Sequence, residues 1–115
     1  MVVSQGDVCW TALPAPTGSG PGYSRPAIVV QGDALNASGL ATVVVVPMTS
    51  NLRWASARGN VLLVSERTGL PADSVANVSQ IVSIDRGLLT ERIGHLDEAE
   101  TQSVLAGIDV VLGRR

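Results

Sequence analysis

The residue best suited to chemistry is an arginine at the start of an apolar run. Arg25 lies between Ser24 and Pro26, directly before residues 27–30 (AIVV). A guanidinium is protonated near neutral pH and presents its N–H donors as a planar fork that fits carboxylates and phosphates. An arginine in this place requires an anion, which is either a carboxylate of the same chain in an ordinary surface ion pair or a phosphate of a bound molecule.

A stretch rich in hydroxyl groups follows the next apolar run. Residues 41–46 (ATVVVV) are followed by Pro47 and then by residues 48–51 (MTSN). Taken alone, this stretch is an ordinary polar turn. Its side chains gain a functional interpretation only in combination with Arg25.

Other residue types exclude several kinds of catalytic site. His95 is the only histidine and Cys9 the only cysteine, so no two-histidine acid/base pair, internal disulfide or multi-cysteine zinc site can form. We expect a buried structural thiol at Cys9, a surface or capping side chain at His95, and chemistry that needs no metal or cofactor. Residues 18–22 (GSGPG) lack the lysine and the following helix of a phosphate-binding loop, which leaves them as a flap or a docking surface.

Composition limits the class of protein. The chain of 115 residues contains no lysine and has a formal net charge of −2, which disfavours a protein that coats RNA broadly but allows a specific nuclease with a local arginine cluster. No apolar run approaches the about 20 residues of a membrane helix, and the N-terminus lacks the features of a signal peptide. We expect one domain over residues 1–115, located in the cytoplasm.

The elements that must position these residues are mostly strands. Residues 6–13 alternate apolar and polar side chains, as a half-buried strand does, and a surface loop dense in Pro and Gly follows at residues 14–24. Short apolar runs predict further strands at residues 27–31, 41–46, 60–64, 74–78 and 80–84. We expect the run at 41–46 to end at Pro47, because proline cannot donate to a ladder.

Helical signals are few. Residues 32–39 can hold one helical turn, and Asp97 with Glu100 forms a capping-box pattern before apolar residues at helical spacing, namely residues 104, 105, 108, 111 and 112. We therefore expect a mainly β (α+β) fold, a small closed or partly closed barrel, with one C-terminal amphipathic helix.

A series of short motifs runs through nearly the whole chain. In order, they are residues 6–8 (GDV), 18–19 (GS), 25–30 (RPAIVV), 45–50 (VVPMTS), 73–75 (DSV), 80–81 (QI), 84–85 (ID) and 89–90 (LT). This series resembles the MazF/PemK toxins, the mRNA interferases of toxin–antitoxin modules. The resemblance implies an SH3-like β-barrel of the MazF/PemK/CcdB type, usually a homodimer.

The resemblance also implies an activity. It is that of a type II toxin, a sequence-specific, metal-independent endoribonuclease that cleaves single-stranded RNA (mRNA, with tRNA and rRNA as further candidates) and so inhibits translation and growth. The ribose 2′-hydroxyl attacks the adjacent phosphorus, leaving a 2′,3′-cyclic phosphate or a 3′-phosphate and a 5′-hydroxyl. DNA lacks this nucleophile and should not be cleaved. Cognate antitoxins of the family end in acidic, initially disordered segments that cover the RNA site.

The resemblance assigns catalytic roles by position. Arg25 matches the family's catalytic arginine and Thr49 its catalytic threonine, and both can donate hydrogen bonds to the extra negative charge of a pentacoordinate phosphorus. Many members carry a glutamate after the Gly-Ser pair of the first loop, where this chain has Gly20. Either proton transfer runs through solvent and the environment of Arg25, or the enzyme is less efficient.

Further positions match residues that contact RNA. Ser74 and Gln80 match such positions, and Ser50, Asn51 and Asn77 are additional candidates for contacts to splayed bases. Asn77 is equally well explained as a turn or strand-edge residue.

The loop after Thr49 contains an aromatic side chain between arginines. Arg53, Trp54 and Arg58 could stack on a base or receive a side chain of the antitoxin.

Other classes of function stay open at this level. A barrel toxin of the CcdB type, or a catalytically weak binding module, would act on a protein target; Gly20 favours this alternative, and the pairing of Arg25 with Thr49 argues against it. A generic SH3-like adaptor is disfavoured because the chain lacks the aromatic-rich groove that Pro-rich ligands need.

Overall fold

The computed structural model describes residues 1–13, 18 and 23–115. In that part of the chain the strands are β1 (Asp7–Leu13), β2 (Tyr23–Val29), β3 (Thr42–Thr49), β4 (Val61–Leu63), β5 (Ser74–Ala76), β6 (Val82–Asp85) and β7 (Leu89–His95). The α-helices are α1 (Asp33–Asn36), α2 (Ser65–Thr68) and α3 (Glu98–Val111), and the 3₁₀ turns are η1 (Leu52–Ser56), η2 (Val78–Gln80) and η3 (Arg86–Leu88). Most of the predicted loop at residues 14–24, with Gly20, lies outside the described residues.

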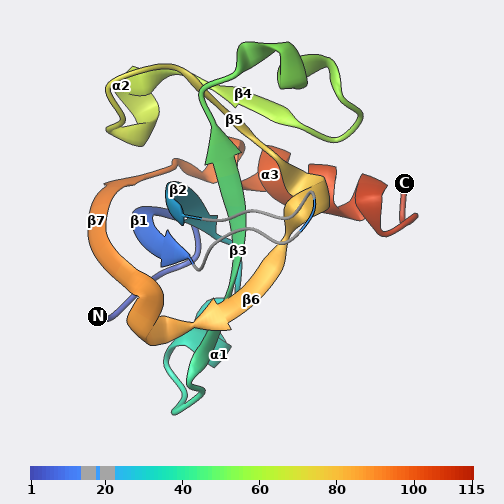
Figure 1. Cartoon of the computed structure of the whole chain (residues 1–115). Coiled ribbons are helices and arrows are strands. Elements are labelled where there is room, and N and C mark those ends of the chain that lie inside the picture. The colour runs from blue at the N-terminus through green and yellow to red at the C-terminus, as the bar shows by residue number, and fades with distance from the viewer. Residues whose placement is uncertain (14–17, 19–22) are drawn as a thin grey trace.

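The sheet is antiparallel and curls around β3. Its order is β4-β5-β3-β2-β1-β7, and β6 pairs with β3 as a further partner. Along its length β3 changes neighbours: its first half pairs with β6, its middle with β2, and Met48 and Thr49 with β5. Figure 1 shows β3 running through the centre of the molecule, with β6 beside its start and β5 beside its end. This exchange of partners bends the sheet into a half-barrel.

The two faces of the curled sheet are both covered. One cluster of buried residues includes Val8, Ile28 and Val46, and a second includes Cys9, Val29 and Val45. Neighbouring residues of one strand thus belong to opposite clusters, because successive side chains point to opposite faces. This explains why the central strands read as continuous apolar runs. The mainly β fold, the partly closed barrel and the C-terminal helix predicted from the sequence are confirmed.

The predicted boundaries of the two central strands β2 and β3 are wrong. Strand β2 begins at Tyr23 instead of residue 27, because its ladder with β1 continues to the pair Leu13 and Tyr23, so Arg25 lies within a strand. Strand β3 continues through Pro47 to Thr49. Pro47 occupies the last pair of the β2–β3 ladder, and its carbonyl accepts a 2.9 Å hydrogen bond from Asn77 N. The missing N–H is tolerated where the ladder ends in any case.

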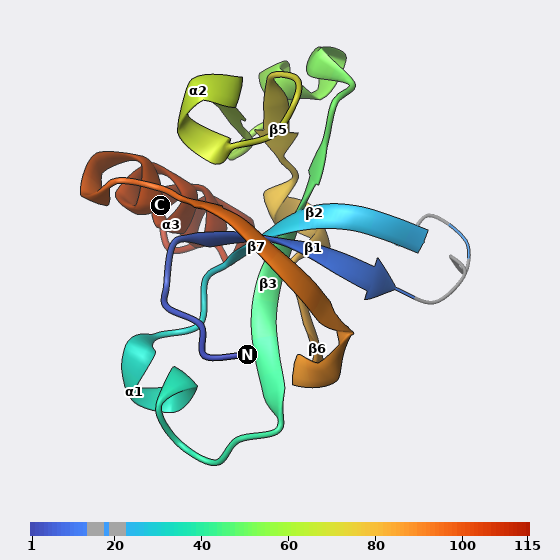
Figure 2. The same cartoon turned by 90° about the vertical axis from the view of Figure 1, so that its left-hand side faces the viewer.

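The sequence did not predict β7 or α2. Strand β7 pairs with β1 at the edge of the sheet, and its middle residues Thr90, Glu91 and Arg92 are exposed, so no apolar alternation marks it. The predicted strand 74–78 is shorter, because the chain turns into η2 after Asn77. Figure 2 shows β7 crossing β1 on the side of the molecule that carries the N-terminus.

Helix α3 begins at the predicted capping box. The Asp97 carboxylate accepts a 2.8 Å hydrogen bond from Glu100 N, and the Glu100 carboxylate accepts one of 3.1 Å from Asp97 N. Val104 and Ile108 are buried, whereas Val111 and Leu112 are exposed, so the apolar face is shorter than predicted. Within the described residues, no helix is long and apolar enough to cross a membrane.

Candidate active site

Two neighbouring strands part where the candidate catalytic residues lie. Strands β2 and β3 pair as far as Ala27 and Pro47. Beyond this pair, Arg25 is matched with Thr11 of β1, and Thr49 is matched with Val75 of β5. The gap between the parting strands carries Arg25 on one side and Thr49 on the other.

A pocket of about 420 Å³ lies at this gap. Its apolar lining consists of Trp10, Pro26, Met48, Leu70, Pro71 and Ala72, and its polar lining of Ser24, Arg25, Thr49, Ser50 and Ser74. Four of the residues selected from the sequence therefore come together: Arg25, Thr49, Ser50 and Ser74. None of the described residues that line the pocket carries a carboxylate or an imidazole.

The backbone of Arg25 is held by a buried hydroxyl. Thr11 is 0% exposed, and its Oγ1 donates a 2.7 Å hydrogen bond to the carbonyl of Arg25. The next residue, Pro26, has a fixed φ and lies opposite Trp10 of β1. Arg25 is thus attached to a well-ordered ladder, although its own side chain is partly exposed.

Thr49 has a hydrogen-bond partner that leaves it a proton to donate. Its Oγ1 accepts a 3.2 Å hydrogen bond from Asn51 N. Asn51 in turn caps η1, since its Oδ1 accepts a 3.3 Å hydrogen bond from Arg53 N. A hydroxyl that accepts here keeps its own O–H as a donor, which is the property that a negatively charged phosphorus centre requires.

Ser74 approaches the pocket from β5. The residue is only 4% exposed, and its Oγ donates a 3.2 Å hydrogen bond to the carbonyl of Ala72. Ala72 lines the pocket as well. Ser74 therefore shapes this wall of the pocket as well as presenting an oxygen there.

The predicted RNA contacts at Asn77 and Gln80 do not line this pocket. Asn77 Oδ1 accepts a 3.3 Å hydrogen bond from Asn60 Nδ2, which also reaches the carbonyl of Trp54 at 3.0 Å. Asn60 Oδ1 accepts from Val78 N at 3.0 Å. Asn60, which no sequence signal indicated, ties the loop after β3 to η2.

The loop residues Arg53, Trp54 and Arg58 also lie outside the pocket lining. Trp54 is 45% exposed, and the Arg53 guanidinium lies over its ring at 5.3 Å from the centroid. Arg58 is exposed as well. Arg53 and Trp54 are therefore already paired with each other at the surface.

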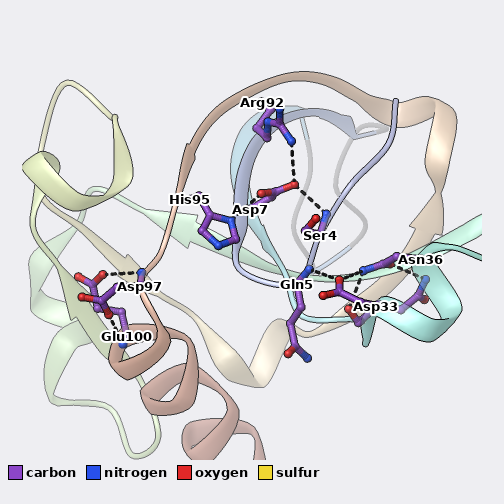
Figure 3. Close-up of polar contacts among 10 residues, drawn as sticks. Ser4, Gln5, Asp7, Asp33, Asn36, Arg92, His95, Asp97 and Glu100 are labelled. Atoms are coloured by element: carbon purple, nitrogen blue, oxygen red, sulfur yellow. Dashed lines mark hydrogen bonds and ion pairs between the residues drawn. The ribbon is translucent and has the colours of Figure 1, made fainter.

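A second cluster of charged groups joins β1 to its neighbour β7 at one edge of the sheet. Asp7 is 2% exposed and accepts hydrogen bonds from Ser4 N (2.8 Å) and Arg92 Nη1 (3.5 Å), and it lies 2.7 Å from His95 Nδ1 (Figure 3). His95 is exposed, as predicted, but its ring is paired. Because β1 and β7 approach from distant parts of the chain, the sequence alone could not show this contact.

Two ionisable groups close to this cluster have shifted pKa values. Hydrogen bonds from Gln5 N at 2.7 Å and from Asn36 Nδ2 at 3.1 Å lower the pKa of Asp33. Burial, with a smaller contribution from the nearby Asp7 charge, raises the pKa of the Cys9 thiol to about 11, as expected for a structural thiol. Among the described residues, no group of three His, Cys, Asp or Glu side chains could hold a metal ion.

Comparisons with known proteins all give the same family. Residues 4–112 match a family described as PemK-like, MazF-like toxin of type II toxin–antitoxin system. The chain is similar to the endoribonuclease MazF2 of Mycobacterium bovis, with 42% identity over 112 residues that cover 97% of this chain and 98% of the relative.

Solved structures share the fold. MazF of Deinococcus radiodurans superposes with a TM-score of 0.81 at 22% identity, covering 98% of each chain. A mycobacterial endoribonuclease in complex with its cognate antitoxin gives a TM-score of 0.70 at 20% identity, covering 97% of this chain and 94% of that one.

Proposed function

The chain belongs to the PemK/MazF family of type II toxins and is an endoribonuclease, and from this premise we propose that it cleaves single-stranded RNA at the pocket between β2 and β3. The observation that carries the proposal is that Arg25 and Thr49, distant in sequence, line one pocket. A polyanion needs a fixed cation and a nearby donor, and this pocket offers both.

The chemical step is an internal phosphoryl transfer. The ribose 2′-oxygen forms a bond to the adjacent phosphorus, and the bond from phosphorus to the 5′-oxygen breaks, leaving a 2′,3′-cyclic phosphate and a 5′-hydroxyl. Arg25 donates two parallel N–H bonds to the non-bridging oxygens, and Thr49 adds one O–H donor. The extra charge is thus stabilised without a metal ion, and DNA is not cleaved.

The proton transfers fall to solvent. Arginine is a poor base near neutral pH, and the described pocket lining offers no carboxylate or imidazole. Water takes the proton of the 2′-hydroxyl, and water returns one to the departing 5′-oxygen. The expected consequence is a slower enzyme than relatives that carry a glutamate at the position of Gly20.

RNA recognition is divided between the pocket and its surroundings. Ser50 and Ser74 line the pocket and contact the nucleotides next to the cut. Asn51, Asn77 and Gln80 contact bases farther along the strand, and Asn77 does so in addition to its bond with Asn60.

A cognate antitoxin is the protein partner. A structural neighbour is an endoribonuclease in complex with its cognate antitoxin. We assign Arg53, Trp54 and Arg58 to the binding of an acidic antitoxin segment, because the two arginines are positively charged. The protein acts as a homodimer in the cytoplasm, with mRNA as the main substrate.

The test is cleavage of several long transcripts of diverse sequence in the presence of EDTA, with cut ends mapped and a single-stranded DNA of the same sequence as control. We expect cuts at a short motif, with 5′-hydroxyl ends, and no cut in the DNA. Arg25→Ala should abolish cutting while leaving the melting temperature nearly unchanged. Transcripts that all remain intact, or an Arg25→Ala protein that still cuts, would overturn the proposal.

A further inference from the structure

The lining of the pocket combines two kinds of side chain. Trp10, Pro26, Met48 and Leu70 are apolar, whereas Ser24, Ser50 and Ser74 carry hydroxyl groups. A nucleobase combines the same two kinds of surface, with apolar π-faces and a rim of donors and acceptors. A volume of about 420 Å³ falls in the about 300–1,000 Å³ range of small-ligand pockets.

We propose that Trp10 is the platform on which one base of the RNA stacks, beside the phosphate held by Arg25. This inference rests on the proposed function and names the substrate group that the pocket receives. Aromatic side chains bind bases in this way because every base presents a π-face. The hydroxyls of Ser24 and Ser50 can donate to or accept from the rim of the base, and the Ser74 hydroxyl, which donates to Ala72, can accept from it.

The backbone of Trp10 is held by both neighbouring strands. Its backbone lies in β1 between Pro26 of β2 and Glu91 of β7, and its carbonyl accepts a 3.3 Å hydrogen bond from Thr90 Oγ1. Part of the side chain packs against the core cluster that contains Val8 and Ile28, and part lines the pocket. A platform fixed by two neighbouring strands holds a base without further ordering of the side chain.

The other tryptophan is less suited to this role. Trp54 does not line the pocket, and the guanidinium of Arg53 lies over its ring. A base that stacked there would have to displace this cation. Trp10 and Trp54 therefore serve as target and matched control in one experiment.

The experiment uses fluorescence, which needs no cleavage. The Trp54→Phe protein contains only Trp10, and the Trp10→Phe protein only Trp54. Each is titrated with 2′-O-methyl octamers of A, C, G and U, which lack the nucleophile and cannot be cut. We expect saturable quenching in the Trp54→Phe protein and none in the Trp10→Phe protein.

A Trp10→Leu change keeps an apolar side chain without a stacking face. We expect it to weaken octamer binding, measured by anisotropy of a labelled octamer, by about 5- to 150-fold, whereas Trp54→Leu leaves binding within twofold. Circular dichroism confirms that each variant is folded, and if Trp10→Leu does not fold, the quenching assay with the two Phe variants decides.

The outcomes separate this inference from the proposed function. Quenching of Trp10 by an octamer, in a protein that cuts no transcript, would support the stacking platform and overturn the nuclease site. Efficient RNA cleavage without quenching of Trp10, or quenching of Trp54 alone, would overturn the platform and leave the nuclease site standing. A protein that neither cuts RNA nor shows quenching would overturn both.

Discussion

The hydroxyl of Thr11 donates a 2.7 Å hydrogen bond to the carbonyl of Arg25, across the ladder between β1 and β2. Thr11, the donor, is fully buried, whereas Arg25 is partly exposed. The bond lies where β2 leaves β3, which is the place where Arg25 would otherwise lose lateral support. Thr11 is in this sense a positioning residue for the candidate catalytic arginine.

Replacement of Thr11 by valine keeps the shape of the side chain and removes the hydroxyl. The carbonyl of Arg25 then loses a partner, and we expect unfolding in urea to show a loss of about 1–3 kcal/mol. A small displacement of Arg25 should lower kcat for RNA cleavage by up to about 100-fold, with KM nearly unchanged. Thr11→Ser should restore kcat. A Thr11→Val enzyme with normal kcat would show that the bond supports stability only.

Thr49 can be tested by the same comparison of isosteric side chains. Thr49→Val removes the proposed donor for the phosphorane oxygens, and we expect kcat to fall by about 10²–10³. Thr49→Ser keeps both the donor and the acceptor for Asn51 N, so it should retain most of the activity. Single-turnover cleavage of a short RNA measures both, and equal rates for the Val and Ser variants would remove Thr49 from the mechanism.

The sequence revealed the catalytic candidates through the resemblance to the MazF/PemK toxins, which assigns Arg25 and Thr49 by position. Arg25 precedes an apolar run, and Thr49 follows one. Their shared pocket could not be derived in this way, because it depends on where the β2–β3 ladder ends. The loop residues Leu70, Pro71 and Ala72 line the pocket, yet in the sequence they only connect two predicted strands, residues 60–64 and 74–78.

Trp10 shows a second limit of sequence patterns. It alternates with Val8 in β1 and therefore reads as a core residue, and part of its side chain is indeed packed on the core. Only the three-dimensional structure shows that another part lines the pocket. Strand β7 was missed for a related reason, since exposed residues at the edge of a sheet obey no apolar pattern.

Asp7 gives a prediction about stability rather than activity. Asp7→Ala leaves Ser4 N, Arg92 and His95 without their buried acceptor, and we expect a loss of about 1–3 kcal/mol in urea unfolding. A double-mutant cycle with His95→Ala should give a clear coupling energy. Asp33→Ala is the control: the Asp33 carboxylate is exposed, so its loss should lower the free energy of unfolding by less. The cleavage rate of folded protein should not change, because Asp7 does not line the pocket.

Cys9 predicts a dependence on alkaline pH. Burial raises the pKa of its thiol from 9.0 to about 11, so between these values the folded protein retains a proton that the unfolded chain has lost. The contribution of the Cys9 thiol to the free energy of unfolding is therefore fully present below about pH 9 and declines as the pH rises toward 11. Urea unfolding at pH 8 and pH 10.5 measures the decline, and Cys9→Ala should show less of it.

An aromatic disulfide reagent at pH 8 should modify the Cys9 thiol slowly in the native protein and rapidly in urea. Rapid modification of the folded protein would mean that Cys9 is not a buried structural thiol.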